Sequence, residues 1–388
     1  MRSGWILGFL GVLVLAVGAG SAVRVRHPVA NGLYYPAEPR KLLAAVNQYM
    51  DEAKTPELPG RYMGCIAPHS AYPFCGAAMG HAFRPLKPGQ YDRVIVLASS
   101  HFAEFEGCSI PAVQYYRTPL GDVELDGPAI GRLQWCPLID TRSVTSKGVK
   151  YYSDGTSRYP LHEVEYSIEV ILPFLQARLG HFRLVPLIVG NFEGREGEIN
   201  EMSLRAAAEA LREIIDDRTF VVASSDLTHF GSAYGYQPFS EDIPNQIEGL
   251  DTQCIDILMH RDYTGFREFL SNTEDRICGV YVLELFLQLM SRDTQGVLLD
   301  YRTSSQVTGD PQTSVSYAAI AFFDRTLAPP EEKTYRAPKH VGPPPDAAAQ
   351  APPPPLMPSQ SIPPAPPAKV EKEPRKKGLI PWFGKDEK

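Results

Sequence analysis

Short apolar runs alternate along the chain with segments whose apolar residues recur at helical spacing. The runs that we predict to be buried strands are 63–67, 93–98, 184–189, 220–223 and 315–323. The segments with helical spacing include 39–53, 167–175, 203–215 and 281–290. Alternation of this kind is typical of an α/β fold with a mostly parallel central sheet flanked by helices. The pattern therefore predicts that fold class.

The first 22 residues have the pattern of an export segment. Arg2 precedes an uncharged run, 5–23, which is rich in Leu, Val, Ala and Gly, and Arg24 follows it. The run closes on the small residues 19–22, which suit a signal peptidase and favour cleavage after Ala22. An uncleaved membrane anchor is the alternative, because the run is long enough to cross a bilayer. Either reading predicts a periplasmic or membrane-anchored domain outside the cytosol.

The composition changes at residue 327. From there to residue 388 the chain is dominated by Pro, Ala, Gln and Ser, and it cannot bury enough apolar surface to fold. We expect an extended, disordered tail. The predicted organisation is a signal peptide or membrane anchor over 1–22, one α/β domain over 23–326 and this Pro-rich tail.

The net charge and the cysteines limit which classes of function are expected. The net charge of -7 gives no basis for nucleic-acid binding. The six cysteines include no Cys-x-x-Cys pair, and a domain of this length does not need disulfides to fold. If one cysteine binds a metal, an odd number remains, so at least one further thiol should be free.

Polar residues follow three of the predicted strands. His69 comes after the first strand, His101 after the second, and Asp226 and His229 after the fourth. In open α/β sheets, ligands bind beyond the carboxyl ends of the strands. A single strand-end histidine is more often structural, but three that converge on one crevice predict a site. Asp226 and His229 can serve there as an acid and base pair, or as a brace that orients a ligand histidine.

Cys278 stands at the entry of a predicted helix. Its thiol pKa should be lowered there by the helix dipole, and thiolate and imidazole together suit iron, copper or zinc. The sequence spacing is also compatible with Cys278 as a small buried residue of the core that lies away from the histidines.

Ordered motifs along the chain resemble those of the Memo family, called AmmeMemoRadiSam system protein B in bacteria. The motifs are Ala67-Pro68-His69, Ser100-His101, Tyr116-Arg117-Thr118-Pro119-Leu120, Glu165-Tyr166-Ser167, Leu172-Pro173-Phe174, Ser224-Ser225-Asp226 with His229, Ile277-Cys278-Gly279 and Ser316-Tyr317-Ala318. The resemblance covers nearly all of the predicted domain.

The resemblance implies a fold similar to that of class III extradiol dioxygenases, which are non-haem iron enzymes. It also implies iron or copper bound by His69, His101 and Cys278. Those dioxygenases use a carboxylate as the third metal ligand. Because this chain has a thiolate there, we expect redox chemistry other than ring-opening.

The chain departs from the family pattern around the predicted crevice. Tyr166, Phe102 and Val280 stand where the family commonly has polar or basic residues. We hypothesise that His162, four residues before Tyr166, supplies the missing imidazole from the same helix face. Glu165 and Glu169 would also share a face if this segment is helical.

Two functions follow. The first is a metal-binding protein, redox-active with iron or copper at His69, His101 and Cys278. The alternative is a non-catalytic module that keeps the dioxygenase-like fold and binds a small molecule or a protein. A hydrolase on the strand-end serines is the weakest reading, because the chain has no Gly-x-Ser-x-Gly elbow.

Overall fold

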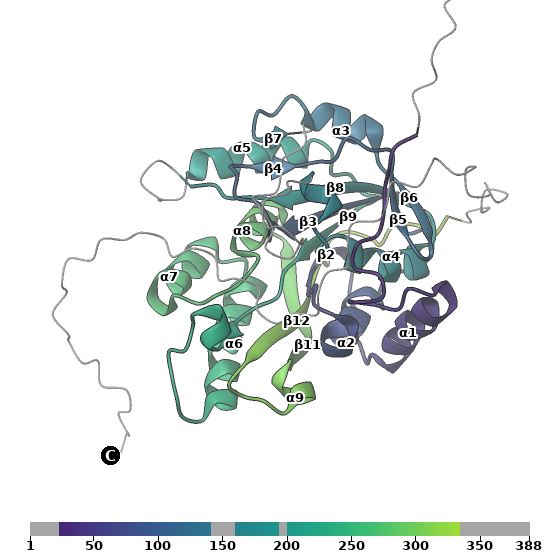
Figure 1. Ribbon diagram of the computed structural model, residues 1–388. Coiled ribbons are helices and arrows are strands. Elements are labelled where there is room, and N and C mark those ends of the chain that lie inside the picture. The colour runs from purple at the N-terminus through teal and green to yellow at the C-terminus, as the bar shows by residue number, and fades with distance from the viewer. Residues whose placement is uncertain (1–22, 141–159, 194–199, 334–388) are drawn as a thin grey trace, which may run out of the picture.

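The computed structural model describes residues 23–140, 160–193 and 200–333. The predicted export segment and most of the predicted tail lie outside these ranges. The described residues form an α/β fold around a large central sheet, with a small second sheet beside it (Figure 1). Within the three ranges, no helix combines the length and apolar character needed to cross a membrane.

The elements alternate along the chain as the sequence predicts. The strands are β1 (Val25–Arg26), β2 (Arg61–Ala67), β3 (Arg93–Ser99), β4 (Cys108–Ser109), β5 (Tyr115–Thr118), β6 (Gly121–Glu124), β7 (Ile139–Asp140), β8 (Arg183–Val189), β9 (Thr219–Ser224), β10 (His229–Phe230), β11 (Thr294–Thr303) and β12 (Ser314–Asp324). The α-helices are α1 (Pro39–Glu52), α2 (Tyr72–Phe83), α3 (Gly127–Leu133), α4 (Leu172–Leu179), α5 (Glu201–Arg212), α6 (Ile243–Met259), α7 (Tyr263–Thr273), α8 (Val280–Leu289) and α9 (Ser305–Thr308). Short 3-10 turns are η1 (Leu161–Glu163), η2 (Glu169–Ile171) and η3 (Ser232–Tyr234).

The central sheet has a parallel middle and antiparallel additions. Its strand order is β10-β12-β2-β9-β3-β8-β4-β7, and β11 pairs with β12. The strands β2, β9, β3 and β8 run parallel, whereas β12 is antiparallel to β2 and β4 is antiparallel to β8. The predicted fold class is confirmed, and the sheet is mixed at its edges. The small sheet joins β1 to β5 and β6.

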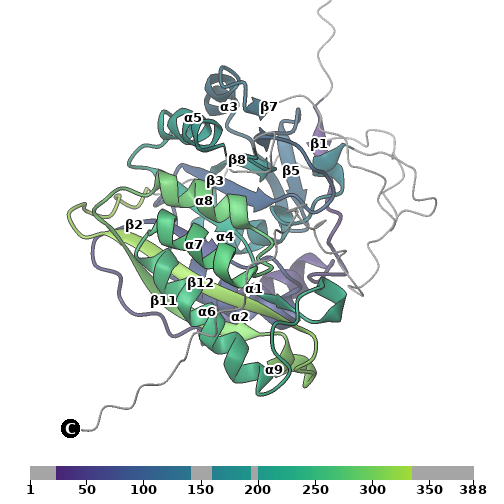
Figure 2. The same cartoon turned by 90° about the vertical axis from the view of Figure 1, so that its left-hand side faces the viewer.

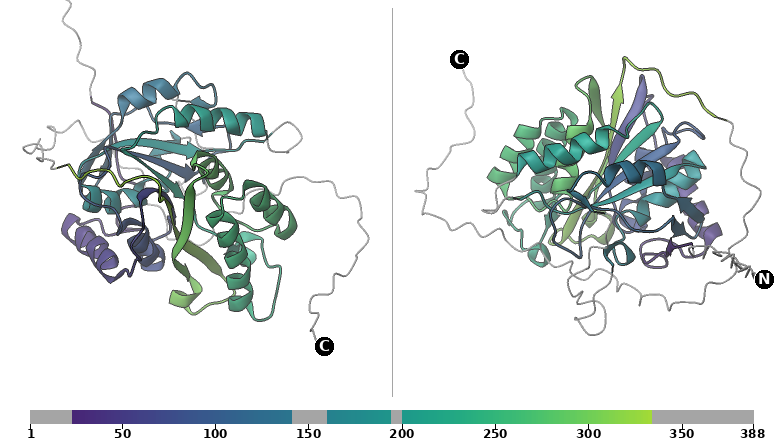
Figure 3. Two further views of the ribbon diagram at one scale, coloured as in Figure 1. Left: turned by 180° about the vertical axis from the view of Figure 1, so that it is seen from behind. Right: turned by 90° about the horizontal axis from the view of Figure 1, so that it is seen from above.

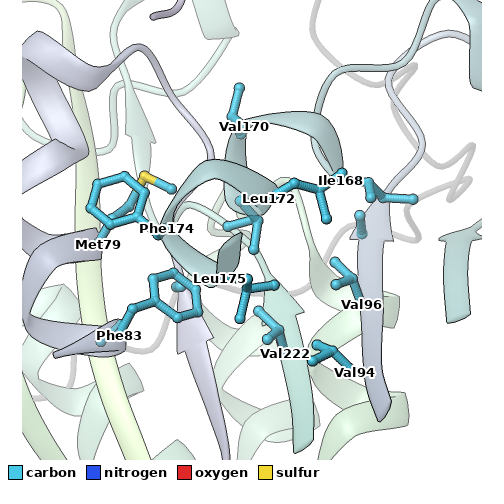
Figure 4. Packing of buried hydrophobic residues seen from close by; sticks show 14 of the residues in the cluster. Met79, Phe83, Val94, Val96, Ile168, Val170, Leu172, Phe174, Leu175 and Val222 are labelled. Carbon is cyan, nitrogen blue, oxygen red and sulfur yellow. The ribbon is translucent and has the colours of Figure 1, made fainter. Parts of the chain in front are cut away.

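Both faces of the sheet are buried, which explains the continuous apolar runs. Along β3, Val94 and Val96 belong to one core cluster, and Ile95 and Leu97 belong to the other. Helices α1, α2 and α4 pack on the first face, and α5, α7 and α8 cover the second (Figures 2 and 3). Figure 4 shows the first core, where side chains of α2 and α4 meet those of β3 and β9. These two layers hold the strand ends rigidly in place.

All five predicted strands are present, within one or two residues of their expected ends. One predicted helix differs: the segment expected over 167–175 becomes α-helical only at Leu172, after the 3-10 turn η2. The backbone N–H groups of Tyr166 and Ser167 instead donate to the carboxylate of Glu165, each over 3.0 Å, which holds the preceding residues in a turn. Pro173 then starts the helix, because its missing N–H costs nothing in the first turn.

Candidate metal centre

Three adjacent parallel strands bring the predicted site residues to one edge of the sheet. Ala67 of β2 and Ala98 of β3 both pair with Ser224 of β9, so the three strands end side by side. His69 lies just beyond β2, and His101 lies just beyond β3. The predicted convergence of strand ends is therefore present in the structure.

His69, His101 and Cys278 form one cluster. Each offers a ligand atom, and these atoms all lie within 4.8 Å of one another. The Sγ atom of Cys278 is 3.3 Å from Nε2 of His69, and the two imidazole rings meet edge to face at 5.0 Å between centroids. His69 is buried, whereas His101 and Cys278 are partly exposed. The exposure is slight, because the side chain of His101 is only 7% exposed.

The His69 ring is oriented by Ser224. The serine hydroxyl donates to the carbonyl of Ser167 over 2.7 Å, so its only hydrogen is used there. Nδ1 of His69, which is 3.0 Å from the same oxygen, must then donate to it. Nε2 is left to face Cys278 as the ligand atom. Burial disfavours the charged ring, but the nearby Cys278 and Asp226 outweigh burial and raise the His69 pKa.

The His101 ring is oriented by Glu165. The carboxylate accepts the backbone N–H of His101 over 2.8 Å and the ring Nδ1–H over 2.9 Å. Burial opposes the charge on both groups, yet their attraction lowers the pKa of Glu165 to about 2 and raises that of His101 to about 10. Carboxylates commonly hold metal-binding histidines in this way and direct the other nitrogen to the metal. The Tyr166 ring stacks on the face of the His101 ring, with centroids 5.0 Å apart.

Cys278 is placed by the loop that leads into α8. Its Sγ atom accepts the backbone N–H of Asp226 over 3.3 Å. Burial favours the neutral thiol, but His69 and His101 outweigh burial and lower the Cys278 pKa well below its usual value. The following residue must be glycine, because a Cβ on Gly279 would stand 2.2 Å from Oγ of Ser225. The thiolate that metal binding needs is thus favoured before any metal arrives.

Asp226 contacts the backbone of His69, whereas His229 is not one of the three clustered residues and does not pair with Asp226. The Asp226 carboxylate accepts the backbone N–H of His69 over 2.8 Å and the hydroxyl of Ser70 over 2.7 Å. It thus has the bracing geometry that was one of the two predicted roles. Nδ1 of His229 lies 2.8 Å from the Leu227 carbonyl, so it carries hydrogen and leaves Nε2 as the basic nitrogen.

The hypothesis that His162 supplies a further imidazole to the cluster is wrong. Its ring is held elsewhere: Nε2 donates to the carbonyl of Ser109 over 3.0 Å, and Nδ1 accepts the hydroxyl of Tyr116 over 2.6 Å. Burial lowers its pKa to about 3, so the ring stays neutral. The expectation that Glu165 and Glu169 share a helix face is also wrong, because Glu165 lies in a turn and faces His101, whereas Glu169 faces Arg26.

Sequence reasoning missed the residues that orient the ligands. Ser224 and Glu165 stood inside recognised motifs, but nothing in their spacing assigned them to His69 and His101. Arg26 carries no sequence signal of its role, because only the structure shows that this charged residue is buried. All six cysteines, which lie within the described ranges, are free thiols, so the expectation of at least one free thiol is met.

The fold and this cluster define an α/β protein with a His/His/Cys cluster at the carboxyl edge of its parallel strands. A family model described as Memo-like protein matches residues 26–321. The chain therefore belongs to the Memo family.

Among known relatives, the Protein MEMO1 of Xenopus laevis is 29% identical over 304 residues, which cover 75% of this chain and 94% of the relative. The human Protein MEMO1 is 27% identical over the same shares of both chains. The Protein memo-1 homolog of Caenorhabditis elegans is 28% identical over 308 residues, covering 75% of this chain and 81% of the relative. An uncharacterized protein from Escherichia coli K12, known from a crystal structure, is 13% identical, with a TM-score of 0.38 and coverage of 67% of this chain and 99% of that one. Kinship to extradiol dioxygenases stays a prediction.

Proposed function

We propose that this protein binds a redox-active metal ion, iron or copper, through His69, His101 and Cys278. The observation that carries the proposal is the meeting of the three ligand atoms within 4.8 Å of one another. Two imidazoles and one thiolate form a donor set that suits copper, iron and zinc. The bound metal would supply one-electron chemistry at the partly exposed side of the cluster.

The surrounding residues fit that role. Ser224 and Glu165 each occupy Nδ1 of one histidine, so both Nε2 atoms are available for a metal. Asp226 braces the backbone of His69, and His229, whose Nδ1 faces the Leu227 carbonyl, keeps its Nε2 free of that bond. In this proposal, His229 moves protons to or from a bound substrate, and Asp226 keeps His69 in place.

Metal content tests the proposal directly. The protein would be purified under anaerobic conditions from metal-replete cells, and its metals would be quantified by mass spectrometry. Near-stoichiometric iron or copper is expected in the parent and should be lost in the triple variant His69→Ala/His101→Ala/Cys278→Ala. The variant His260→Ala/Cys136→Ala is a matched control, because it removes a histidine and a cysteine outside the cluster and should keep the metal.

A non-catalytic binding module is the second candidate, and two ring contacts favour it. Tyr166 stacks on His101 where the family commonly has an imidazole, and Tyr34 packs on Tyr166 with centroids 4.3 Å apart. Such a wall of rings suits a small molecule or a peptide with an apolar face. Parent and triple variant that both fold normally and both lack metal would exclude the metal proposal and leave this one.

A further inference from the structure

A buried arginine ties the start of the described chain to the loop that carries Glu165. Val25 and Arg26 form β1, which pairs in parallel with Tyr115 and Tyr116 of β5. The Arg26 side chain turns inward and is 1% exposed as a residue, with its guanidinium 5.0 Å from the centre of the Tyr116 ring. A fully buried charge must be paired and hydrogen-bonded, so every contact of this group matters.

The three guanidinium nitrogens all contact one short stretch of the chain, residues 162–169. Nε donates to the carbonyl of His162 over 2.7 Å, and Nη2 donates to the carbonyl of Glu165. Nη1 forms an ion pair with the carboxylate of Glu169, and both side chains are fully buried. One arginine thus fixes the backbone at two points and the side chain at a third.

Glu169 connects the same stretch back to the N-terminal segment. Its carboxylate accepts the backbone N–H groups of Val29 over 2.8 Å and Ala30 over 2.9 Å, and also the hydroxyl of Tyr35. The segment 25–35 and the loop 162–169 therefore hold each other through a closed set of buried hydrogen bonds.

This set leads directly to a candidate metal ligand. Arg26 holds the main chain of Glu165, and the side chain of Glu165 holds both the backbone and the ring of His101. No atom of Arg26 needs to touch the cluster for this to matter, because supporting residues set the direction of a ligand ring. Lysine could balance the charge of Glu169, but a single ammonium cannot reproduce the planar fork of donors.

We propose that Arg26 is a positioning residue for the metal centre, which is complete only when segment 25–35 is seated against loop 162–169. The inference rests on the proposed metal-binding function. The proposal also gives a role to the residues directly after the predicted export segment. They support the loop whose Glu165 holds His101 in place. The state of the N-terminal segment and the state of the site are therefore coupled.

Three full-chain variants test this. Arg26→Lys keeps the charge and removes the fork of donors, whereas Glu169→Gln removes the charge of the partner and leaves the bonds of Arg26 to both carbonyls. Arg117→Lys is a matched control, because Arg117 lies on β5 and pairs with the part-exposed Asp122. Two readouts are needed: the affinity for Co²⁺, followed by its visible absorption bands, and the Nδ1–H proton resonance of His101 in the metal-free protein, assigned by its loss in His101→Gln.

The expected result for Arg26→Lys is loss of the His101 resonance and Co²⁺ binding weaker by about 10- to 100-fold. The amide of Glu169→Gln keeps one oxygen to accept the Ala30 N–H and the Tyr35 hydroxyl, so segment 25–35 stays seated. This variant should melt at a lower temperature yet keep the resonance and the affinity, which separates positioning from stability. An Arg26→Lys protein with the resonance and affinity of the parent would overturn the inference. If Arg26→Lys does not fold, the double variant Arg26→Gln/Glu169→Gln, which removes the buried charge at both of these positions, takes its place with the same expected losses.

Failure of the proposed function has a different signature. A folded parent that does not bind Co²⁺ would contradict metal binding, and the resonance would still decide whether Arg26 positions His101.

Discussion

Glu165 and His101 are joined twice: one carboxylate oxygen accepts the backbone N–H of His101 over 2.8 Å, and the other accepts its ring Nδ1–H over 2.9 Å. Both the position and the rotation of the imidazole are therefore fixed by a single side chain. Because Glu165 is fully buried and also accepts the N–H groups of Tyr166 and Ser167, it cannot move to release the ring. The candidate ligand His101 is thus held in place without a metal.

Glu165→Gln should weaken metal binding by about 10- to 100-fold, because an amide cannot accept both N–H groups of His101 as strongly as a carboxylate does. The measurement is Co²⁺ affinity by absorbance titration. Glu163→Gln, two residues away and exposed, should leave the affinity unchanged. Equal affinities for parent and Glu165→Gln would show that this carboxylate does not support a metal ligand.

Gly279→Ala should destabilise the protein by about 1–3 kcal/mol, because its Cβ would lie 2.2 Å from Oγ of Ser225. The displaced loop carries Cys278, so metal content should fall as well. Urea unfolding measures the first effect. Gly249→Ala within α6, where a Cβ meets nothing within 4 Å, should instead gain about 0.5–1 kcal/mol from helix propensity.

Stability should fall as the pH rises toward neutrality, in part because of Glu284. This side chain is fully buried in α8, and neither carboxyl oxygen has a hydrogen-bond partner among the residues that the structure describes. Burial raises its pKa from 4.5 to about 7, although Arg267 acts in the opposite direction. The folded protein therefore keeps a proton that the unfolded chain releases, and stability declines between those two pKa values and stays lower above them. The loss should be on the order of 3 kcal/mol.

Glu284→Gln removes this titration. Urea unfolding at pH 5 and pH 8 should show a smaller difference for the variant than for the parent, and a more stable variant at pH 8. The exposed Glu209→Gln on α5 should behave like the parent at both values. A parent with the same stability at both pH values, or a variant with an unchanged difference, would contradict a protonated Glu284.

His162→Ala should lower stability and leave the metal content unchanged. The substitution removes the hydrogen-bond partner of two buried groups, the Tyr116 hydroxyl and the Ser109 carbonyl. Each such loss costs about 1–3 kcal/mol of stability. The check pairs thermal unfolding with metal quantification. Loss of metal from a His162→Ala protein that still folds would restore His162 as a ligand.

Much of the fold could be predicted from local patterns. The continuous apolar runs identified β2, β3, β8, β9 and β12, because strands buried on both faces consist mostly of apolar side chains. The strand β11 was not predicted. Its pairing shifts between Leu298 and Asp300, and this bulge breaks the regular spacing on which such predictions depend.

The candidate site, too, could be predicted from the sequence only in part. The strand-end positions of His69 and His101 follow from the sequence, because adjacent parallel strands must end at one edge. His162 is a position that sequence spacing predicted wrongly. It is close to Glu165 along the chain, but Ser109 and Tyr116 hold its ring away from the cluster. Short segments without regular structure have no fixed periodicity, so their side-chain directions are set by distant partners.

The sequence by itself determined the main buried strands, the edge at which the histidines gather and membership of the Memo family. Only the tertiary structure decided that Cys278 meets His69 across 209 positions of the chain, and that Arg26 supports the loop of Glu165. The reason is physical. Hydrophobic periodicity is a local property that each element carries alone, whereas a buried thiolate or guanidinium acquires its partners only when separate layers pack and exclude water.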